Sequence, residues 1–178
     1  IMLGDVTVTV NGVPAPLLYV SPTQINGQIP VETAAGQARI VVNRVGLGGG
    51  EVRANVASAA PAIFEFADTS GNFALALNQD YSINSLDMPA APGDFMSFFL
   101  TGAGAVSPVV ASGSPGVADP LSYVVAKVTA TIGFQTADVS FAGLAPGFVG
   151  LVQVNARVPN VPTGIQPVTI IVGGVASN

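Results

Sequence analysis

Short runs of alternating apolar and polar residues recur along the chain, and glycine or proline separates them. Val6–Val10 alternates valine with threonine, and Asn11-Gly12, a common two-residue hairpin turn, comes directly after it. Similar alternation occurs in Ile25–Ile29 and Ala38–Asn43. No stretch keeps a helical period over several turns without a glycine or proline, so the pattern predicts an all-β chain. Further strands are expected at 15–20, 51–56, 63–66, 73–77, 94–101, 128–132, 152–158 and 168–170, and loops at 46–50 and 107–120.

The last third of the chain repeats the first third. Val128–Ile132 aligns with Val6–Val10, and, after an insertion around 145–151, Asn155 aligns with Asn26. A repeat of this kind indicates two units built on one supersecondary plan. The size and strand count of each unit are those of an immunoglobulin-like sandwich. The predicted fold is therefore all-β, with two tandem immunoglobulin-like β-sandwich units related by an internal repeat.

The repeat places the first domain at 1–60 and the second at 61–178, and each domain lacks one strand that the other has. The first is expected to lack its opening strand, because nothing in it corresponds to the aromatic strand 94–101. The second is expected to lack its closing strand, the counterpart of 51–56. A sheet without one of its strands exposes unpaired backbone groups. We therefore expect either a piece of a longer protein or a strand supplied by a neighbouring molecule.

Charged residues are scarce in this chain of 178 residues. They make up 8% of it, against roughly 25% in an average protein, while hydrophobic residues make up 49%. No run of about 18 apolar residues is free of turn formers, so membrane insertion by helices is not expected. A chain so poor in charge favours burial in an assembly or in a larger multidomain protein. Its net charge of −5 repels phosphate backbones, so nucleic acid is not expected as a partner.

The beginning of the chain and its residue usage bear on its location. Ile1 does not begin a signal peptide, because Asp5 follows early and no basic segment precedes an apolar one. We therefore expect a mature or excised piece of a longer chain. Threonine, serine, asparagine and glycine are frequent and there is one lysine, which favours an exported protein over a cytosolic one.

The chain contains no histidine and no cysteine. Their absence excludes Ser-His-Asp and Cys-His catalysis, histidine or thiolate metal sites, and disulfides. Gly113–Gly116 lacks the spacing of a nucleophile elbow and Gly46–Gly50 lacks the Lys-Ser/Thr of a phosphate loop, so both are interpreted as turns. No catalytic, cofactor-binding or metal-binding residue is assigned, and no cofactor is expected.

The polar loop Asn78–Asn84 is the best candidate for a ligand site, because alternating oxygen-bearing side chains could bind calcium. The glycine and the acid that a calcium loop needs at its sixth and twelfth positions are replaced by Ile83 and Pro89. A hydrogen-bonded turn is therefore the favoured interpretation. The same weighting applies to the loop Asp68–Asn72.

Two other chemistries can be weighed from the sequence. Lys127 could form an isopeptide bond with an asparagine or aspartate, but alternation along its strand points it outward. Phe95, Phe98 and Phe99 could form an aromatic platform for sugars, but a row of phenylalanines in one strand is more typical of a buried core.

Several long segments resemble one known family. These segments are VTVNGVPAPLLYVSPTQINGQIP, APAIF, ALNQDYSINS, TGAG, VSFAGLAPGFVGLVQVNARVP and PVTIIVGGVASN. Together they cover nearly the whole chain and are similar to the Solibacter-type C-terminal domain. The resemblance implies an exported bacterial protein with a β-sandwich fold and no established biochemical activity. Members of that family usually have an opening strand before the VTVNG segment and a further short strand after the end of this chain.

These observations favour a non-catalytic, extracellular structural or interaction module at the cell surface. We expect it to form a homo-oligomer or polymer, or to join other domains of a larger surface protein, through β-strand edges. The alternative is a carbohydrate-binding module that uses the loop Ser107–Pro120 or surface tyrosine and asparagine side chains. An enzyme would need a carboxylate pair and ranks last. The tip Pro146-Gly147-Phe148, within the insertion of the second copy, is a further candidate for an intermolecular contact.

Overall fold

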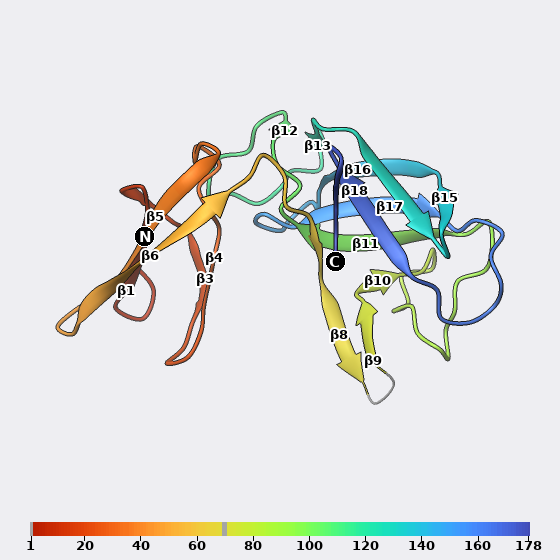
Figure 1. The fold of residues 1–178 in the computed structure, drawn as a ribbon, viewed down its shortest axis with the longest axis horizontal. Coiled ribbons are helices and arrows are strands. Elements are labelled where there is room, and N and C mark those ends of the chain that lie inside the picture. The colour runs from red at the N-terminus through yellow and green to blue at the C-terminus, as the bar shows by residue number, and fades with distance from the viewer. Residues whose placement is uncertain (1, 69–70) are drawn as a thin grey trace. The chain divides into compact units, whose positions relative to one another are not determined.

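The protein is all-β. The computed structural model describes residues 2–68 and 71–178, which form nineteen strands and no helix (Figure 1). Within these ranges, therefore, no helix is long and apolar enough to span a bilayer. The chain divides into two compact units, Ile1–Ser58 with Val110–Pro115, and Ala59–Val109 with Gly116–Asn178. The domain limits expected from the repeat, 1–60 and 61–178, do not include this return of Val110–Pro115 to the first unit.

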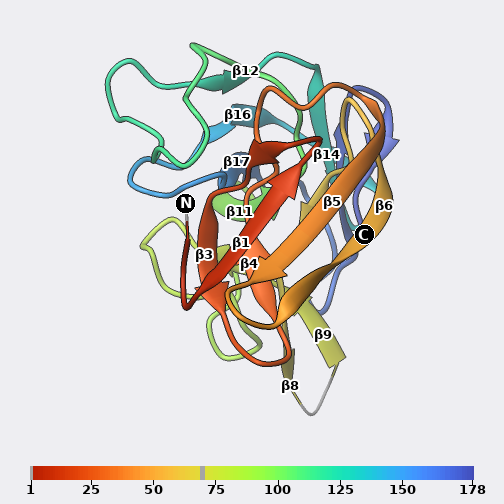
Figure 2. The same ribbon diagram turned by 90° about the vertical axis from the view of Figure 1, so that its left-hand side faces the viewer.

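The first unit places a four-stranded sheet, in the order β2-β1-β5-β6, against the hairpin β3–β4 (Figure 2). All neighbouring strands in both parts are antiparallel. The strands are β1 (Val6–Val10), β2 (Val13–Pro14), β3 (Leu17–Val20), β4 (Ile25–Gly27), β5 (Gly36–Arg44) and β6 (Gly48–Val56).

Alternation along β1 builds the core of this unit. Val6, Val8 and Val10 are buried, whereas the threonines between them are only half-buried. They pack with Ala15 and Ala38, and partly buried residues of β3 and β5 complete the cluster. The core of this unit is aliphatic, and it is built on the alternating valines of β1.

The second unit contains two larger sheets. The first has the order β15-β14-β18-β19, and the second has the order β10-β11-β17-β16-β13-β12 with β7 also paired to β11. A separate hairpin, β8–β9, lies outside both. The strands are β7 (Ala62–Ile63), β8 (Glu65–Asp68), β9 (Gly71–Ala74), β10 (Ala76–Leu77), β11 (Phe95–Thr101), β12 (Val106–Ser107), β13 (Tyr123–Val124), β14 (Val128–Ile132), β15 (Gln135–Ala137), β16 (Val139–Leu144), β17 (Val152–Arg157), β18 (Val168–Val172) and β19 (Val175–Ala176).

Both sheets of the second unit contribute fully buried side chains. Phe98 and Leu100 of β11 and Val154 of β17 come from one sheet, and Ile170 and Val172 of β18 come from the other. Within β11 and within β18 the buried residues are two positions apart, as expected for a strand with one buried face. This burial pattern gives the unit a β-sandwich-like character.

The two units share strand order and register. β15-β14-β18-β19 pairs in the same order as β2-β1-β5-β6. In the hairpins, Leu17↔Gly27 and Tyr19↔Asn26 correspond to Val139↔Ala156 and Phe141↔Asn155, with an irregularity at the equivalent point in each. The repeated segments therefore pair in the same order in these sheets, and in equivalent registers in these hairpins.

Three local expectations need correction. The glycine segment expected to be a loop at 46–50 is shorter, because β6 already begins at Gly48 and pairs with Arg44. The second unit does have a closing strand, because Gly173 and Gly174, at φ 57° and 89°, turn the chain so that β19 pairs with β18. Phe95, expected in the core, is exposed, whereas Phe98 is buried.

Candidate functional site

The hairpin β3–β4 has a free edge where its counterpart in the second unit is covered. β17 pairs with β16 on one side and with β11 on the other. β4 pairs with β3, and in the described part of the chain no strand lies along its other edge. Since β4 and β17 are equivalent, this free edge is where a counterpart of β11 would lie.

The backbone of β4 shows which groups face the free edge. Gln28 N donates to Pro16 O at 2.9 Å, and Ser21 N donates to Gln24 O at 2.8 Å, so residues 24 and 28 bond toward β3. Successive residues of a strand direct their amide groups to opposite edges. The N–H and C=O groups of Ile25 and Gly27 therefore point to the free edge, where they are available to another strand.

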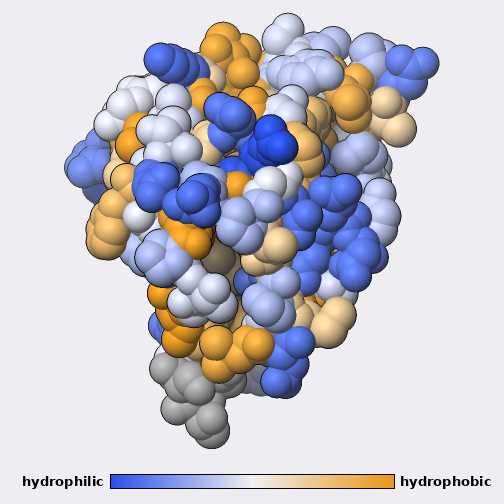
Figure 3. Space-filling model, turned by 90° about the vertical axis from the view of Figure 1, so that its right-hand side faces the viewer, coloured by the Kyte–Doolittle hydropathy of each residue, from blue (hydrophilic) through white to orange (hydrophobic). Residues whose placement is uncertain are grey.

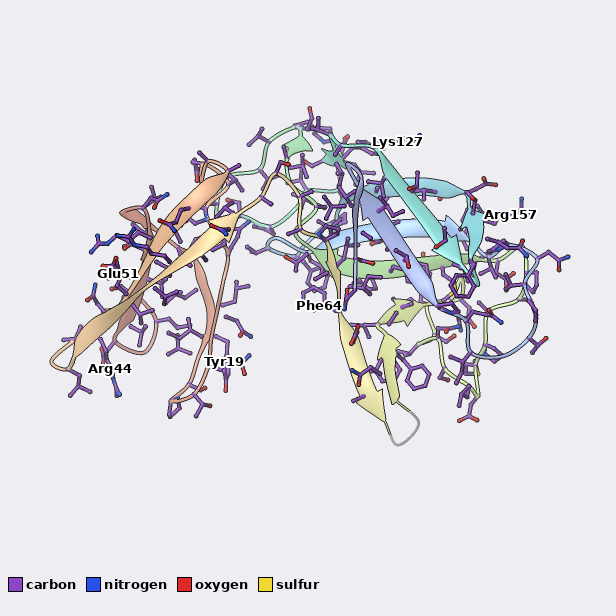
Figure 4. The ribbon with its side chains drawn as sticks, in the orientation of Figure 1. Tyr19, Arg44, Glu51, Phe64, Lys127 and Arg157 are labelled. Atoms are coloured by element: carbon purple, nitrogen blue, oxygen red, sulfur yellow. The ribbon has the colours of Figure 1, made fainter. Side chains whose placement is uncertain are left out.

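Beside this edge lies an apolar hollow of about 210 Å³ between the hairpin and the sheet. It is lined by Val8, Val10, Ala15, Leu17, Ile25, Gly27, Gln28, Ile29, Ile40 and Val42. These side chains come from β1 and β5 on one side and from β3, β4 and the residues after it on the other. Figure 4 shows carbon-rich side chains of this unit between the two layers, with Tyr19 labelled on β3.

Side chains beside the hollow are more exposed than the side chains at the equivalent positions of the second unit. Ile25 is 37% exposed, whereas its equivalent Val154 is 0% exposed. Ile29 is 45% exposed, whereas its equivalent Val158 is 7% exposed. In the second unit Val154 lies opposite Phe98 of β11, which covers it. The first unit thus presents apolar side chains that its own described strands do not cover.

A side-chain pair on the outer face of β4 is repeated on β17. Gln24 Nε2 donates to Asn26 Oδ1 at 2.7 Å, and Gln153 Nε2 donates to Asn155 Oδ1 at 2.8 Å. In the second unit a third group joins the pair, because Ser97 of β11 donates from its Oγ to Asn155 Oδ1 at 2.9 Å. Gln153 Nε2 also lies 3.4 Å from Ser97 Oγ, to which it donates. The equivalent pair on β4 has the same geometry without this hydroxyl.

Charge in the first unit is concentrated on the β5–β6 ribbon. Arg39 Nη2 lies 2.8 Å from Glu51 Oε2, and Arg53 Nε lies 3.9 Å from Glu51 Oε1. Glu51 and Arg44 are labelled on this ribbon in Figure 4. Exposed pairs of this kind add little stability, about 0–1 kcal/mol each. They supply hydration, whereas the lining of the hollow has no charged side chain.

The polar loop Asn78–Asn84 directs its oxygens to its own residues. Asn84 Nδ2 donates to Asn78 Oδ1 at 2.9 Å, and Ser82 donates to Asp80 Oδ1 from both its N at 3.0 Å and its Oγ at 2.6 Å. These bonds hold the pKa of Asp80 below the ordinary value of an aspartate, mainly through the Ser82 hydroxyl. Gln79 Oε1 also accepts from Phe95 N at 3.1 Å, so the loop helps to position the start of β11.

A shallow hollow of about 480 Å³ adjoins this loop, lined by Asn78, Gln79, Asp80, Asp87, Met88, Pro89, Ala90 and Asp94. Across residues 2–68 and 71–178, no three acidic side chains come together in a way that could hold a metal ion. The hydrogen bonds among Asn78, Asp80, Ser82 and Asn84 give the loop the geometry of a turn. Of the other loop weighed for calcium, 68–72, residues Thr69 and Ser70 lie outside the described residues.

The loop Ser107–Pro120 is attached to the first unit through its middle. Ser112 Oγ accepts from Val31 N at 2.8 Å and donates to Glu32 Oε2 at 2.9 Å. Gly113 N donates to Gln28 Oε1 at 2.7 Å. These contacts lie just after β4 in the chain, so the segment Val110–Pro115 fixes the end of that strand.

The remaining candidates are dispersed. Lys127 is exposed immediately before β14, and Arg157 is the last residue of β17 (Figure 4). The tip Pro146-Gly147-Phe148 bonds to Gly116, through Gly147 N to Gly116 O at 2.8 Å and Gly116 N to Phe148 O at 2.9 Å. Phe148 itself is 58% exposed. On the face shown in Figure 3, apolar residues lie among polar ones.

The aromatic side chains that are most exposed do not stack on one another. Among the described residues the aromatic pairs in contact are Phe66–Phe73, with ring centroids 5.8 Å apart, and Tyr123–Phe141, at 5.5 Å. Tyr81 is 83% exposed and takes part in neither pair. A sugar-binding surface therefore stays a prediction.

Comparisons of the chain with known families, with curated proteins and with solved structures find no match. The site must therefore be interpreted from its geometry. The sequence repeat predicted that the first unit lacks a counterpart of β11. The hollow lies beside the edge of β4 where that counterpart would pair. The Gln–Asn pair was not identified from sequence, although the QIN of β4 and the QVN of β17 align in the repeat and could have indicated it.

Proposed function

We propose that this chain is a non-catalytic, extracellular structural module that associates with other polypeptides through open sheet edges. The observation that carries the proposal is the free edge of β4 beside an uncovered apolar hollow, at the position that β11 fills in the second unit. Burial of apolar surface together with backbone hydrogen bonds drives strand addition to an exposed edge. Covering Ile25 and Ile29 would stabilise an assembly by about 1 kcal/mol each.

Three further features support this function. Hydrophobic residues make up 49% of the chain and charged residues 8%, a composition suited to a protein that buries surface against neighbours. The two units with one strand order fit tandem immunoglobulin-like sandwiches, which commonly serve as building blocks of surface proteins. The resemblance to the Solibacter-type C-terminal domain is consistent with export to the cell surface. A homo-oligomer, a polymer, or a larger surface protein would each use the edges in the same way.

Self-association is the first consequence to test. Sedimentation velocity over a wide concentration range should show assembly of the wild-type chain, weakened in the variant Ile25→Asp. The matched control is Val45→Asp, which puts the same charge at a 67%-exposed valine beyond the end of β5. A wild-type chain that stays monomeric at every concentration would contradict self-assembly. Equal association of all three chains would contradict the role of β4.

A further inference from the structure

The second unit contains a direct template for what covers β4. β11 pairs antiparallel with β17 over six residue pairs, with Met96 opposite Ala156, Phe98 opposite Val154 and Leu100 opposite Val152. These three β11 side chains are buried, at 7%, 0% and 0% exposure. Through the repeat, Ala156 and Val154 correspond to Gly27 and Ile25, and this correspondence fixes the register of a strand on β4.

We infer that β4 is completed in trans by an extended segment of another polypeptide that imitates β11. The segment runs antiparallel to β4 and places an apolar side chain at every second position into the hollow. A large residue lies opposite Ile25, as Phe98 lies opposite Val154, and another lies opposite Gly27, as Met96 lies opposite Ala156. This occupant deepens the proposed function and rests on it, because it names the partner of the same edge.

The hydroxyl ladder on the other face makes the required sequence more specific. Ser97 lies between Met96 and Phe98 and joins the Gln153–Asn155 pair. Gln24 and Asn26 already have the same mutual bond, at 2.7 Å. A serine or threonine between the two large residues of the occupant would complete the ladder. The partner strand therefore has the pattern apolar–Ser/Thr–apolar–any–apolar.

β11 of the same chain does not supply the occupant, because both of its edges are already paired. Its two edges are paired with β17 on one side and with β10 and β7 on the other. Releasing it to reach β4 would expose Phe98 and Leu100, which are fully buried. Strand addition by a separate segment needs no such rearrangement.

Two features of the first unit fit addition of a strand at this edge. The amide groups of Ile25 and Gly27 face outward, in the positions equivalent to those through which β17 meets β11. At Val158, the equivalent of Ile29, Val158 N donates to Asp94 O and Gly93 N donates to Val158 O, both at 2.9 Å. Ile29 is exposed and can take the same pair of bonds with the beginning of an added strand.

A synthetic peptide with the sequence of residues 94–102, flanked by lysines for solubility, tests the inference on the whole chain. Fluorescence anisotropy should show saturable binding, and hydrogen exchange should slow at the amides of Ile25 and Gly27. The Ile25→Asp variant should bind at least about tenfold more weakly because a charge enters the apolar hollow, and Val45→Asp should bind as the wild type does. A peptide with aspartate at the position of Phe98 is the matched ligand control and should not bind.

The ladder is tested by a pair of mild changes that leave the apolar contacts intact. A peptide with Ser97→Ala should bind the wild-type chain roughly two- to tenfold more weakly, because it loses the hydroxyl that would bond to Asn26 and Gln24. The chain variant Asn26→Ala should weaken binding of the serine peptide by a similar factor. Combining both changes should cost less than the sum of the two separate losses, because both remove the bond between the peptide hydroxyl and Asn26. Additive losses would contradict the ladder.

The outcomes separate this inference from the function on which it rests. Peptide binding with slowed exchange at Ile25 and Gly27 supports the inference, even for a chain that sediments as a monomer. Self-association through β4 without uptake of the peptide overturns it and leaves edge association standing, with a second copy as the occupant. A folded chain that stays monomeric and shows no peptide binding overturns both.

Discussion

β17 and β4 are equivalent strands of the repeat that lie in different surroundings. They share register, a bulge position, and a Gln–Asn side-chain pair on the outer face. One has a neighbour on each edge and its inward side chains are fully buried. Among the described residues, β4 has a neighbour on one edge only, and Ile25 and the following Ile29 are exposed. The comparison teaches that the hairpin forms in both surroundings, and that its inward side chains are fully buried only where a third strand adjoins it.

The first unit has its own means of tolerating the open edge. Its charged side chains are concentrated on the β5–β6 ribbon, where Arg39, Glu51 and Arg53 keep the outer surface hydrated. The segment Val110–Pro115 fixes the end of β4 through Ser112 and Gly113. Neither feature covers the hollow, so the edge is held in place and left open at the same time.

The largest expected effect comes from removing the Phe98 side chain of β11 in the second unit. Phe98→Ala should destabilise that unit by about 3–5 kcal/mol, because Phe98 is fully buried on β11, opposite Val154 of β17. Phe95→Ala, on the same strand but 39% exposed, should cost under about 1 kcal/mol. Urea denaturation followed by circular dichroism measures both. Equal losses would show that β11 does not form the core.

A matched pair of substitutions compares the two strands directly. Val154→Ala should cost about 2–3 kcal/mol, because the removed methyl groups leave a cavity in a fully buried site. Ile25→Ala should cost about 1 kcal/mol or less, although it removes more carbon, because this side chain is already 37% exposed. Denaturation curves give both values. A larger loss at Ile25 would mean that the hollow is closed in solution.

The equivalent hairpin turns offer a change that should stabilise. Asn11-Gly12 and Gly133-Phe134 both have positive φ at both positions, and Phe134 is at 63° with 88% of its surface exposed. A bulky residue pays for this left-handed conformation, and glycine does not. Phe134→Gly should therefore raise the stability of the second unit by about 1 kcal/mol. A loss of stability would show that the Phe134 ring makes contacts that favour the fold.

The smallest effect concerns the loop that leads into β11 and has no counterpart in the first unit. The pKa of Asp80 should lie below the ordinary value of an aspartate, because the Ser82 hydroxyl and amide stabilise its charged form. A depressed folded-state pKa adds stability above the unfolded pKa, and that stability is lost as the pH falls through the folded value. Carboxyl-carbon NMR should find the pKa of Asp80 raised in Ser82→Ala. An unchanged pKa in the variant would show that the Ser82 hydroxyl does not stabilise the charged Asp80 carboxylate.

Much of the fold was predictable because it rests on local alternation. Val6–Val10 and the equivalent strand Val128–Ile132 of the second unit were predicted from the alternation of apolar residues with threonine. The repeat then aligned Asn155 with Asn26, and the two hairpins pair in equivalent registers at these residues. Phe95 was assigned to the core wrongly, because a row of phenylalanines does not reveal which alternate positions face inward.

The site was predictable in part. The missing counterpart of β11 followed from the repeat, because a repeat compares one unit with another. The hollow and the outward amides of Ile25 and Gly27 needed the pairing of β4 with β3, which depends on contacts between strands rather than on sequence spacing. The short strand β19 was missed since two residues carry too little alternation to be recognised.

Amide hydrogen exchange along β4 and β17 in the chain alone tests the central claim most directly. In β17 the amides of both edges are paired, so residues 153–156 should be protected to a similar degree. In β4 protection should alternate, with Asn26 and Gln28 slow and Ile25 and Gly27 fast, because the last two face an edge without a partner strand. Uniform protection along β4 in a monomeric chain would contradict the open edge.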